Sequence, residues 1–228
     1  MALIGNLKAF DDFESVVKSF KNENPSLKAI LFDMDGTILN SEPLHAFAIY
    51  QVLPEINFPI NYEDKEIKNE EELQDFFCGQ SDASLFTFFK NILGDKWSET
   101  EDSFIHKKNL LLEHSLTKEQ LEESFAPEIK NILTKLKDDG FKLGLVSASQ
   151  KSIVDNFSEA LNFSQWFEFM MGAEDTEKTK PDPMPYIEGM DRFKVGPQET
   201  LIFEDSETGL ESALSSEAYV YKVEWYKD

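Results

Sequence analysis

The segment AILFDMDGTI, at residues 29–38, constrains the fold more than any other part of the sequence. Its first four residues are all apolar, which is typical of a short β-strand that is covered on both faces. Asp33 and Asp35 follow directly, although two carboxylates at this separation repel each other. The segment therefore predicts a buried strand that ends in two acids, and these acids need a partner to offset their charge.

Four later segments also have the pattern of buried strands, and helical patterns separate them. The expected strands are FKLGLVSAS at 141–149, WFEFMMG at 166–172, TLIFED at 200–205 and AYVYKVEW at 218–225. Apolar residues at helical spacing predict helices at about 8–21, at 129–139 with Gly140 as the C-terminal cap, and at about 153–161. Strands that alternate with helices predict an α/β fold with a parallel sheet.

Residues 41–123 interrupt this alternation with a stretch that is mostly helical in pattern. Clusters of Phe and Leu are separated by acidic segments, and the segment PEINFPINYEDKEIKNEEE at 54–72 is expected to be a solvated loop leading into a helix. We therefore expect two domains: an α/β core formed by residues 1–40 and 124–228, and an inserted helical domain formed by residues 41–123.

The composition limits which binding partners and which cellular compartment we expect for this protein. The formal net charge of −22 argues against binding to nucleic acid or to anionic membranes, which require basic patches. No apolar run approaches the roughly 20 residues that span a bilayer, and the N-terminal segment meets acids too early for a secretory signal. The single cysteine gives no disulfide framework. These features predict a cytoplasmic protein and leave its oligomeric state open.

Polar side chains gather where the expected strands end. In open α/β sheets the ligand site lies at the carboxyl ends of the strands. This edge would receive four carboxylates, one hydroxyl and, from a loop, one lysine: Asp33, Asp35, Glu204, Asp205, Ser147 and Lys180. So many acids would repel one another without a cation. The fitting partner is a hard divalent cation with oxygen ligands, and we expect Mg²⁺, which also tolerates several bound waters.

Such a site suits phosphoryl transfer. Mg²⁺ neutralises phosphate charge, lysine adds a positive charge and serine adds a hydrogen bond. A central Asp can act as nucleophile through an aspartyl-phosphate, while a second acid moves the proton. Lys178 is an alternative to Lys180, but Pro181 disfavours helix at Lys180 and fixes the loop there, which favours Lys180 as the phosphate ligand.

Four segments in order resemble motifs of the haloacid dehalogenase-like (HAD) hydrolase superfamily: FDMDGTI, VSAS, KPDP and FEDSETG. The likeness is to the branch that includes beta-phosphoglucomutase and phosphoglycolate phosphatase, and it covers nearly the whole chain. It implies a Rossmann-like core with an inserted α-helical cap. It also implies a Mg²⁺-dependent phosphoric monoester hydrolase that acts on a small phosphorylated metabolite.

The resemblance also implies roles for individual residues. Asp33 would be the nucleophile, and Asp35 the general acid/base that lends its backbone carbonyl to the metal. Asp205 and Glu204 would complete the Mg²⁺ site. The residues that would bind the phosphoryl group are Gly36, Thr37, Ser147, Ala148 and Lys180. The presence of Asp35 favours phosphate esters, because the dehalogenases and phosphonate hydrolases of the superfamily lack an acid at this position.

The inserted domain leaves the substrate open. The resemblance implies substrate contacts for His45, Gly79 and Gln80, whereas His106 and His114 are expected to be ordinary helix residues. Residues 41–123 carry 18 acids, 7 lysines and no arginine. A phosphomutase needs cations to grip a second phosphate, so this balance favours a phosphatase over a beta-phosphoglucomutase-like enzyme. A binding protein that keeps the fold without catalysis is the remaining alternative.

Overall fold

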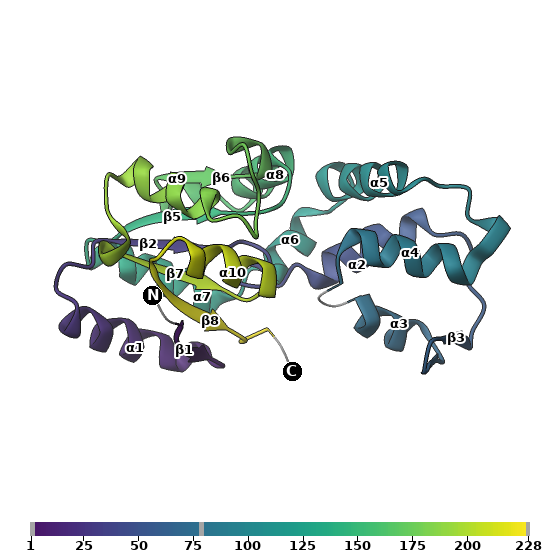
Figure 1. Ribbon diagram of the computed structural model, residues 1–228, viewed down its shortest axis with the longest axis horizontal. Coiled ribbons are helices and arrows are strands. Elements are labelled where there is room, and N and C mark those ends of the chain that lie inside the picture. The colour runs from purple at the N-terminus through teal and green to yellow at the C-terminus, as the bar shows by residue number, and fades with distance from the viewer. Residues whose placement is uncertain (1–2, 78–79, 227–228) are drawn as a thin grey trace. The chain divides into compact units, whose positions relative to one another are not determined.

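The computed structural model describes residues 3–77 and 80–226, which form two compact units (Figure 1). The core unit is Met1–Asn40 with Lys118–Asp228, and the insert unit is Ser41–Thr117. The insert begins where the sequence predicted, but it ends at Thr117 and not at residue 123. The reason is that helix α6 (Lys118–Ser124) packs against helix α8 (Lys151–Ala160) of the core unit.

Among the described residues, the core unit contains one six-stranded sheet in the order β1-β8-β7-β2-β5-β6. All neighbouring strands are parallel, which confirms the predicted α/β fold. The strands are β1 (Leu3–Leu7), β2 (Ala29–Phe32), β5 (Lys142–Val146), β6 (Phe169–Met171), β7 (Thr200–Glu204) and β8 (Tyr219–Val223). Strand β2 is fully buried and lies between β7 and β5, as its apolar run predicts.

Successive side chains of these strands point to opposite faces of the sheet, and each face packs in its own apolar layer. On one face, Leu31 and Ile202 pack against helices α9 (Met184–Phe193) and α10 (Glu207–Ser215). On the other face, Phe32 and Phe203 are in register and stack with ring centroids 5.2 Å apart. Helix α1 (Phe10–Glu23) places Phe13 on this aromatic layer, 4.8 Å from the Phe203 ring.

The helices of the core confirm most of the predicted pattern, and one strand was not predicted. Helix α1 matches the helix expected at about 8–21, and helix α7 (Pro127–Asp138) is followed by Gly140 at a φ of +84°. Strand β1 was missed because its sequence, LIGNL, contains Gly and Asn, which are depleted in strands. It forms through parallel pairing with β8 at the far end of the chain.

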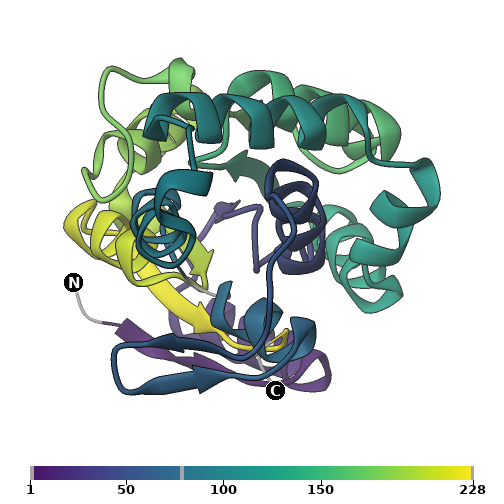
Figure 2. The same cartoon turned by 90° about the vertical axis from the view of Figure 1, so that its right-hand side faces the viewer.

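The insert unit is mainly helical, with helices α2 (Glu42–Val52), α3 (Glu70–Phe77), α4 (Asp82–Leu93) and α5 (Glu101–His114). The expected loop at 54–72 is wrong in part: strands β3 (Ile60–Tyr62) and β4 (Lys65–Ile67) form an antiparallel hairpin there (Figure 2). Ile60 and Ile67 pair across it and are buried in the apolar core of the insert. Burial of these two side chains stabilises the hairpin, which the acidic sequence between them did not indicate.

No helix in the described part of the chain has both the length and the hydropathy that crossing a bilayer would require.

Candidate active site

The parallel sheet delivers the predicted polar residues to one edge. Asp33 directly follows β2, Ser147 follows β5, and Asp205 follows β7, whose last residue is Glu204. Backbone hydrogen bonds continue the sheet past these ends: Asp33 N donates to Phe203 O at 3.0 Å and Ser147 N donates to Met171 O at 2.9 Å. The strand pairing therefore brings residues from distant parts of the sequence together.

Lys180 links these strand ends. Its Nζ donates to Asp33 Oδ1 at 2.6 Å, to Glu204 Oε1 at 2.8 Å and to the Val146 carbonyl at 2.9 Å. The Lys180 side chain is only 3% exposed, whereas Lys178 is 64% exposed and pairs with Asp182. Of the two lysines considered from the sequence, Lys180 is the one that lies among the strand-end acids.

Burial and charge act together on this ion pair. Burial raises the pKa of the Asp33 carboxyl; Lys180 opposes this shift, and the neighbouring acids Glu204, Asp205 and Asp35 add to it. Burial by itself lowers the pKa of Lys180, but the carboxylates of Asp33 and Glu204 more than offset that effect, and its pKa is raised. A buried ammonium flanked by two carboxylates stays charged, so Lys180 provides a fixed positive charge at this edge.

Glu204 is completely buried, and donors surround its carboxylate. Oε1 accepts from Lys180 and from the Tyr186 hydroxyl, the latter at 3.2 Å. Oε2 accepts from the backbone N–H and the hydroxyl of Ser206, at 2.8 and 3.1 Å. Four hydrogen bonds hold this side chain in one orientation.

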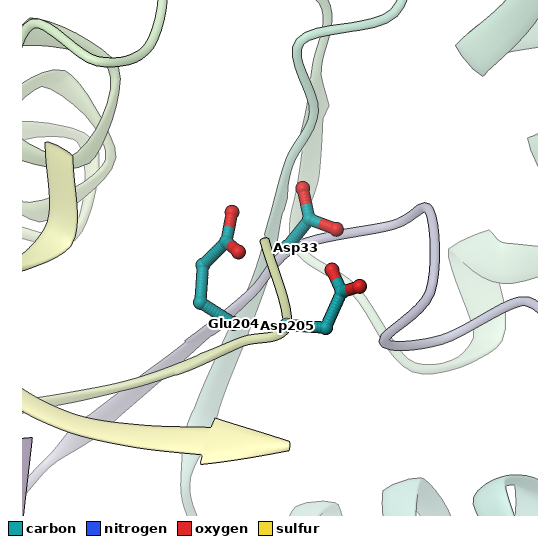
Figure 3. Close-up of side chains that lie close together, drawn as sticks. All are labelled: Asp33, Glu204 and Asp205. Carbon is teal, nitrogen blue, oxygen red and sulfur yellow. The ribbon is translucent and has the colours of Figure 1, made fainter. Parts of the chain in front are cut away.

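Three carboxylates form a candidate metal centre. Asp33, Glu204 and Asp205 each offer an oxygen, and these oxygens lie within 4.8 Å of one another (Figure 3). Gly36, at a φ of +77°, brings its backbone against Asp205: a Cβ at this position would lie 2.3 Å from Asp205 Oδ2. This glycine allows the loop after β2 to approach the acids closely. The close set of carboxylate oxygens fits a hard divalent cation such as Mg²⁺.

Asp35 is held by two serines of the VSAS segment. Its Oδ2 accepts from Ser149 Oγ at 2.7 Å and from Ser147 Oγ at 3.3 Å. Ser147 Oγ in turn accepts from the backbone N–H of Ser149 at 2.9 Å. The β5 strand end thus orients the carboxylate of Asp35.

Sequence reasoning missed Ser149 and Tyr186. Ser149 belongs to the segment VSAS, and the hydroxyl two residues beyond Ser147 was the available signal. Tyr186 lies on α9 and is fully buried, with its ring centroid 4.8 Å from Lys180 Nζ. A tyrosine six residues after the lysine gave no signal in the sequence, because its contact with Glu204 depends on how α9 packs on the sheet.

The residues predicted to bind phosphate through their backbone differ in burial and in hydrogen bonding. The Gly36 N–H donates to Leu39 O at 2.8 Å and so closes the loop after β2. Thr37 is buried, and Ala148 is exposed immediately beyond Ser147. Phosphate contacts by Gly36, Thr37 and Ala148 stay predictions.

The predicted substrate residues belong to the insert unit. His45 is half-buried on α2, and Gln80 is exposed just before Ser81, the N-cap of α4. Gly79 lies outside the described residues. Substrate contacts by these three residues also stay predictions.

Comparison with known proteins identifies the family. The model of the haloacid dehalogenase-like hydrolase family matches residues 30–223. A phosphoglycolate phosphatase from Aquifex aeolicus is 27% identical over 186 residues, which cover 82% of this chain and 79% of the relative.

Two solved structures share the fold. CbbY from Rhodobacter sphaeroides, in complex with phosphate, has a TM-score of 0.64 at 19% identity and covers 88% of both chains. A beta-phosphoglucomutase from Clostridium difficile has a TM-score of 0.56 at 23% identity, covering 85% of this chain and 83% of that one. The matched residues 30–223 include every residue of the strand-end site and most of the chain. This chain therefore belongs to the haloacid dehalogenase-like hydrolase family.

Proposed function

We propose that this protein is a Mg²⁺-dependent phosphatase that hydrolyses a small phosphorylated metabolite through an aspartyl-phosphate. The observation that carries the proposal is the contact of Asp33 with Lys180 beside the carboxylates of Glu204 and Asp205. A carboxylate nucleophile, a fixed cation and a metal-binding oxygen set are what phosphoryl transfer through an enzyme carboxylate requires. Family membership and the phosphatase named among the relatives support it.

In the first half-reaction a carboxylate oxygen of Asp33 attacks phosphorus, and the bond from phosphorus to the leaving oxygen breaks. Asp35, oriented by Ser147 and Ser149, donates its proton to that oxygen. In the second half-reaction Asp35 takes a proton from water, the water oxygen bonds to phosphorus, and the Asp33 carboxylate leaves. Lys180 and Ser147 stabilise charge on the transferring group.

The metal would be held by Asp33 and Asp205, with the Asp35 backbone carbonyl as the further ligand that the family resemblance implies. Both oxygens of Glu204 already accept hydrogen bonds, so we propose that its charge acts on the site mainly by fixing Lys180. When bound, Mg²⁺ would neutralise phosphate charge and offset the repulsion among the acids. The acidic composition and the single cysteine support action in the cytoplasm.

The test is the Asp33→Asn variant with p-nitrophenyl phosphate and Mg²⁺. Turnover should fall by about 10⁴-fold or more, because an amide cannot form the acyl phosphate. Asp155→Asn is the matched control: it changes an exposed aspartate that pairs with Lys151, and it should keep full activity. Unchanged turnover in Asp33→Asn would refute the assignment.

Two further outcomes separate the alternatives. Conversion of β-glucose 1-phosphate to the 6-phosphate without release of phosphate would show a phosphomutase. A wild-type protein that is inert toward a broad panel of phosphate esters, with Mg²⁺ present, would show a non-catalytic binding protein.

A further inference from the structure

The two ends of the chain lie outside the family match at residues 30–223, and the structure joins them. Strand β1 pairs with β8, and the pairing continues past the strand, since Glu224 N donates to Leu7 O at 2.8 Å. Helix α1 follows β1 directly. The added N-terminal segment therefore lies beside the last described residues, Trp225 and Tyr226.

Four aromatic residues form a cluster at this junction, which we call the aromatic bracket: Phe10, Phe13, Trp225 and Tyr226. The Phe10 ring lies 5.1 Å from the ring of Trp225 and 5.6 Å from that of Tyr226. Phe13 lies 5.9 Å from Trp225. Helix α1 therefore fixes the positions of both C-terminal rings.

The polar atoms of the bracket hold the loop that follows the nucleophile. Trp225 Nε1 donates to the Thr37 carbonyl at 3.0 Å, and the Tyr226 hydroxyl donates to the Ile38 carbonyl at 3.2 Å. Both donors are 188 residues away from their acceptors in the sequence. Two successive carbonyls of the loop are thus held from outside it.

The same loop carries the proposed general acid. Ile38 N and Leu39 N both donate to Met34 O at 2.9 Å. The backbones of Asp35 and Leu39 also pair as an isolated parallel β-bridge. The backbone of Met34 and Asp35 is therefore fixed to residues 38 and 39, the part of the loop that includes the Ile38 carbonyl held by the bracket. A shift of those carbonyls would move Asp35 relative to Ser149 and the strand ends.

We propose that Trp225 and Tyr226 are positioning residues, which hold the loop Gly36–Leu39 and thereby set the place of the Asp35 carboxylate. The inference rests on the proposed function for its catalytic consequence, but the hold on the loop can be measured without activity. It assigns a role to the N-terminal extension, which the family motifs leave unexplained.

Amide hydrogen exchange tests the hold on the loop. The variants are Trp225→Phe and Tyr226→Phe, which keep the rings and remove the two donors. Exchange of the peptide spanning residues 36–39 should become about fivefold faster in each, the factor expected for one lost hydrogen bond. Trp166→Phe is the matched control: it removes an indole N–H that donates to Thr134 Oγ1 at 2.9 Å in the same unit, and the loop should exchange as in wild type.

Dependence on the leaving group tests the consequence for Asp35. A displaced general acid matters most for a leaving oxygen that must be protonated, and least for a good leaving group such as p-nitrophenolate. In the double variant Trp225→Phe/Tyr226→Phe, turnover of phenyl phosphate should fall about tenfold or more, whereas turnover of p-nitrophenyl phosphate should fall less than about threefold. A variant that merely lowers the folded fraction would lose both activities equally.

These outcomes separate the two proposals. Wild-type protein that is inert toward the broad panel of phosphate esters would refute the phosphatase, while exchange of residues 36–39 would still decide whether the bracket holds the loop. Exchange equal to that of Trp166→Phe would overturn the inference. Faster exchange with equal losses for both esters would overturn the link to Asp35.

Discussion

Gly209 and Glu204 are in direct contact at the start of α10: a Cβ on Gly209 would lie 1.6 Å from Oε1 of Glu204. The same oxygen accepts from Lys180 and Tyr186. The absence of a side chain at Gly209 therefore gives the buried carboxylate its place, and through it the place of the lysine that contacts Asp33.

Gly209→Ala should be destabilising, although alanine is favoured over glycine in a helix by about 1 kcal/mol. The methyl group would displace Glu204 and break its hydrogen bonds, and we expect a loss of about 1–3 kcal/mol in unfolding free energy. Turnover should fall by about tenfold or more as Lys180 loses its second carboxylate. Thermal unfolding and steady-state rates measure the two effects.

Gly196→Ala is the control for this prediction. Gly196 has a φ of −93°. A Cβ added to it would lie 3.9 Å from Glu199 Oε2, its nearest neighbouring atom. It should stay within about 0.5 kcal/mol of wild type. If both variants behaved alike, the tight contact at Gly209 would have no energetic effect.

Lys180→Met and Lys178→Met should differ sharply. The first leaves Asp33 and Glu204 buried without their cation, which costs about 3–5 kcal/mol for a buried pair, and it removes the charge proposed to hold the phosphoryl group. The second removes an exposed, solvent-screened ion pair with Asp182, which contributes little to stability. Turnover per folded molecule should fall at least 100-fold in Lys180→Met and less than about threefold in Lys178→Met. The reverse order would assign the phosphate contact to Lys178.

Removal of metal should abolish turnover and lower stability together. Chelation leaves the carboxylates of Asp33 and Asp205 in mutual repulsion, and Mg²⁺ at 100 times its dissociation constant should restore about 2.7 kcal/mol. Calorimetry measures this as a rise in the melting temperature. Asp205→Asn should weaken or remove the Mg²⁺-dependent rise, whereas Asp155→Asn should keep it. An undiminished rise in Asp205→Asn would exclude Asp205 as a ligand.

Phe13→Ala tests the aromatic layer beneath the site. Phe13 is buried against Phe203 and Phe32, and its truncation should cost about 3–5 kcal/mol. Leu110→Ala removes an exposed apolar side chain and should cost less than about 0.5 kcal/mol. Urea unfolding followed by near-ultraviolet circular dichroism compares them, and equal midpoints would show that the layer contributes little.

The sequence predicted the core of the site because that part depends on simple rules. Buried runs locate strands, parallel strands end at one edge, and Asp33, Ser147 and Asp205 follow those ends directly. The choice of Lys180 over Lys178 depended on a proline, a local signal, and the lysine does lie among the acids. Their chemical roles stay predictions for the experiments above.

The features that were missed depend on partners far away in the sequence. Strand β1 is a poor strand by composition and forms only against β8, and the β3–β4 hairpin depends on burial of Ile60 and Ile67. The contact of Tyr186 with Glu204 requires α9 to be packed in place. Local patterns contain no information on such pairings, because the stabilisation comes from the assembled layers.

The pairing of β1 with β8 has a consequence for synthesis on the ribosome. Leu3 is in register with Val220, so the first strand is translated roughly 200 residues before its neighbour in the described sheet emerges (Figure 2). Its partner is also the segment that leads into Trp225 and Tyr226. Until β8 emerges, the nascent chain holds β1 without its partner strand and α1 without part of its packing surface. A premature stop that removed β8 and the residues after it would therefore leave β1 without its partner and α1 without its contacts to Trp225 and Tyr226.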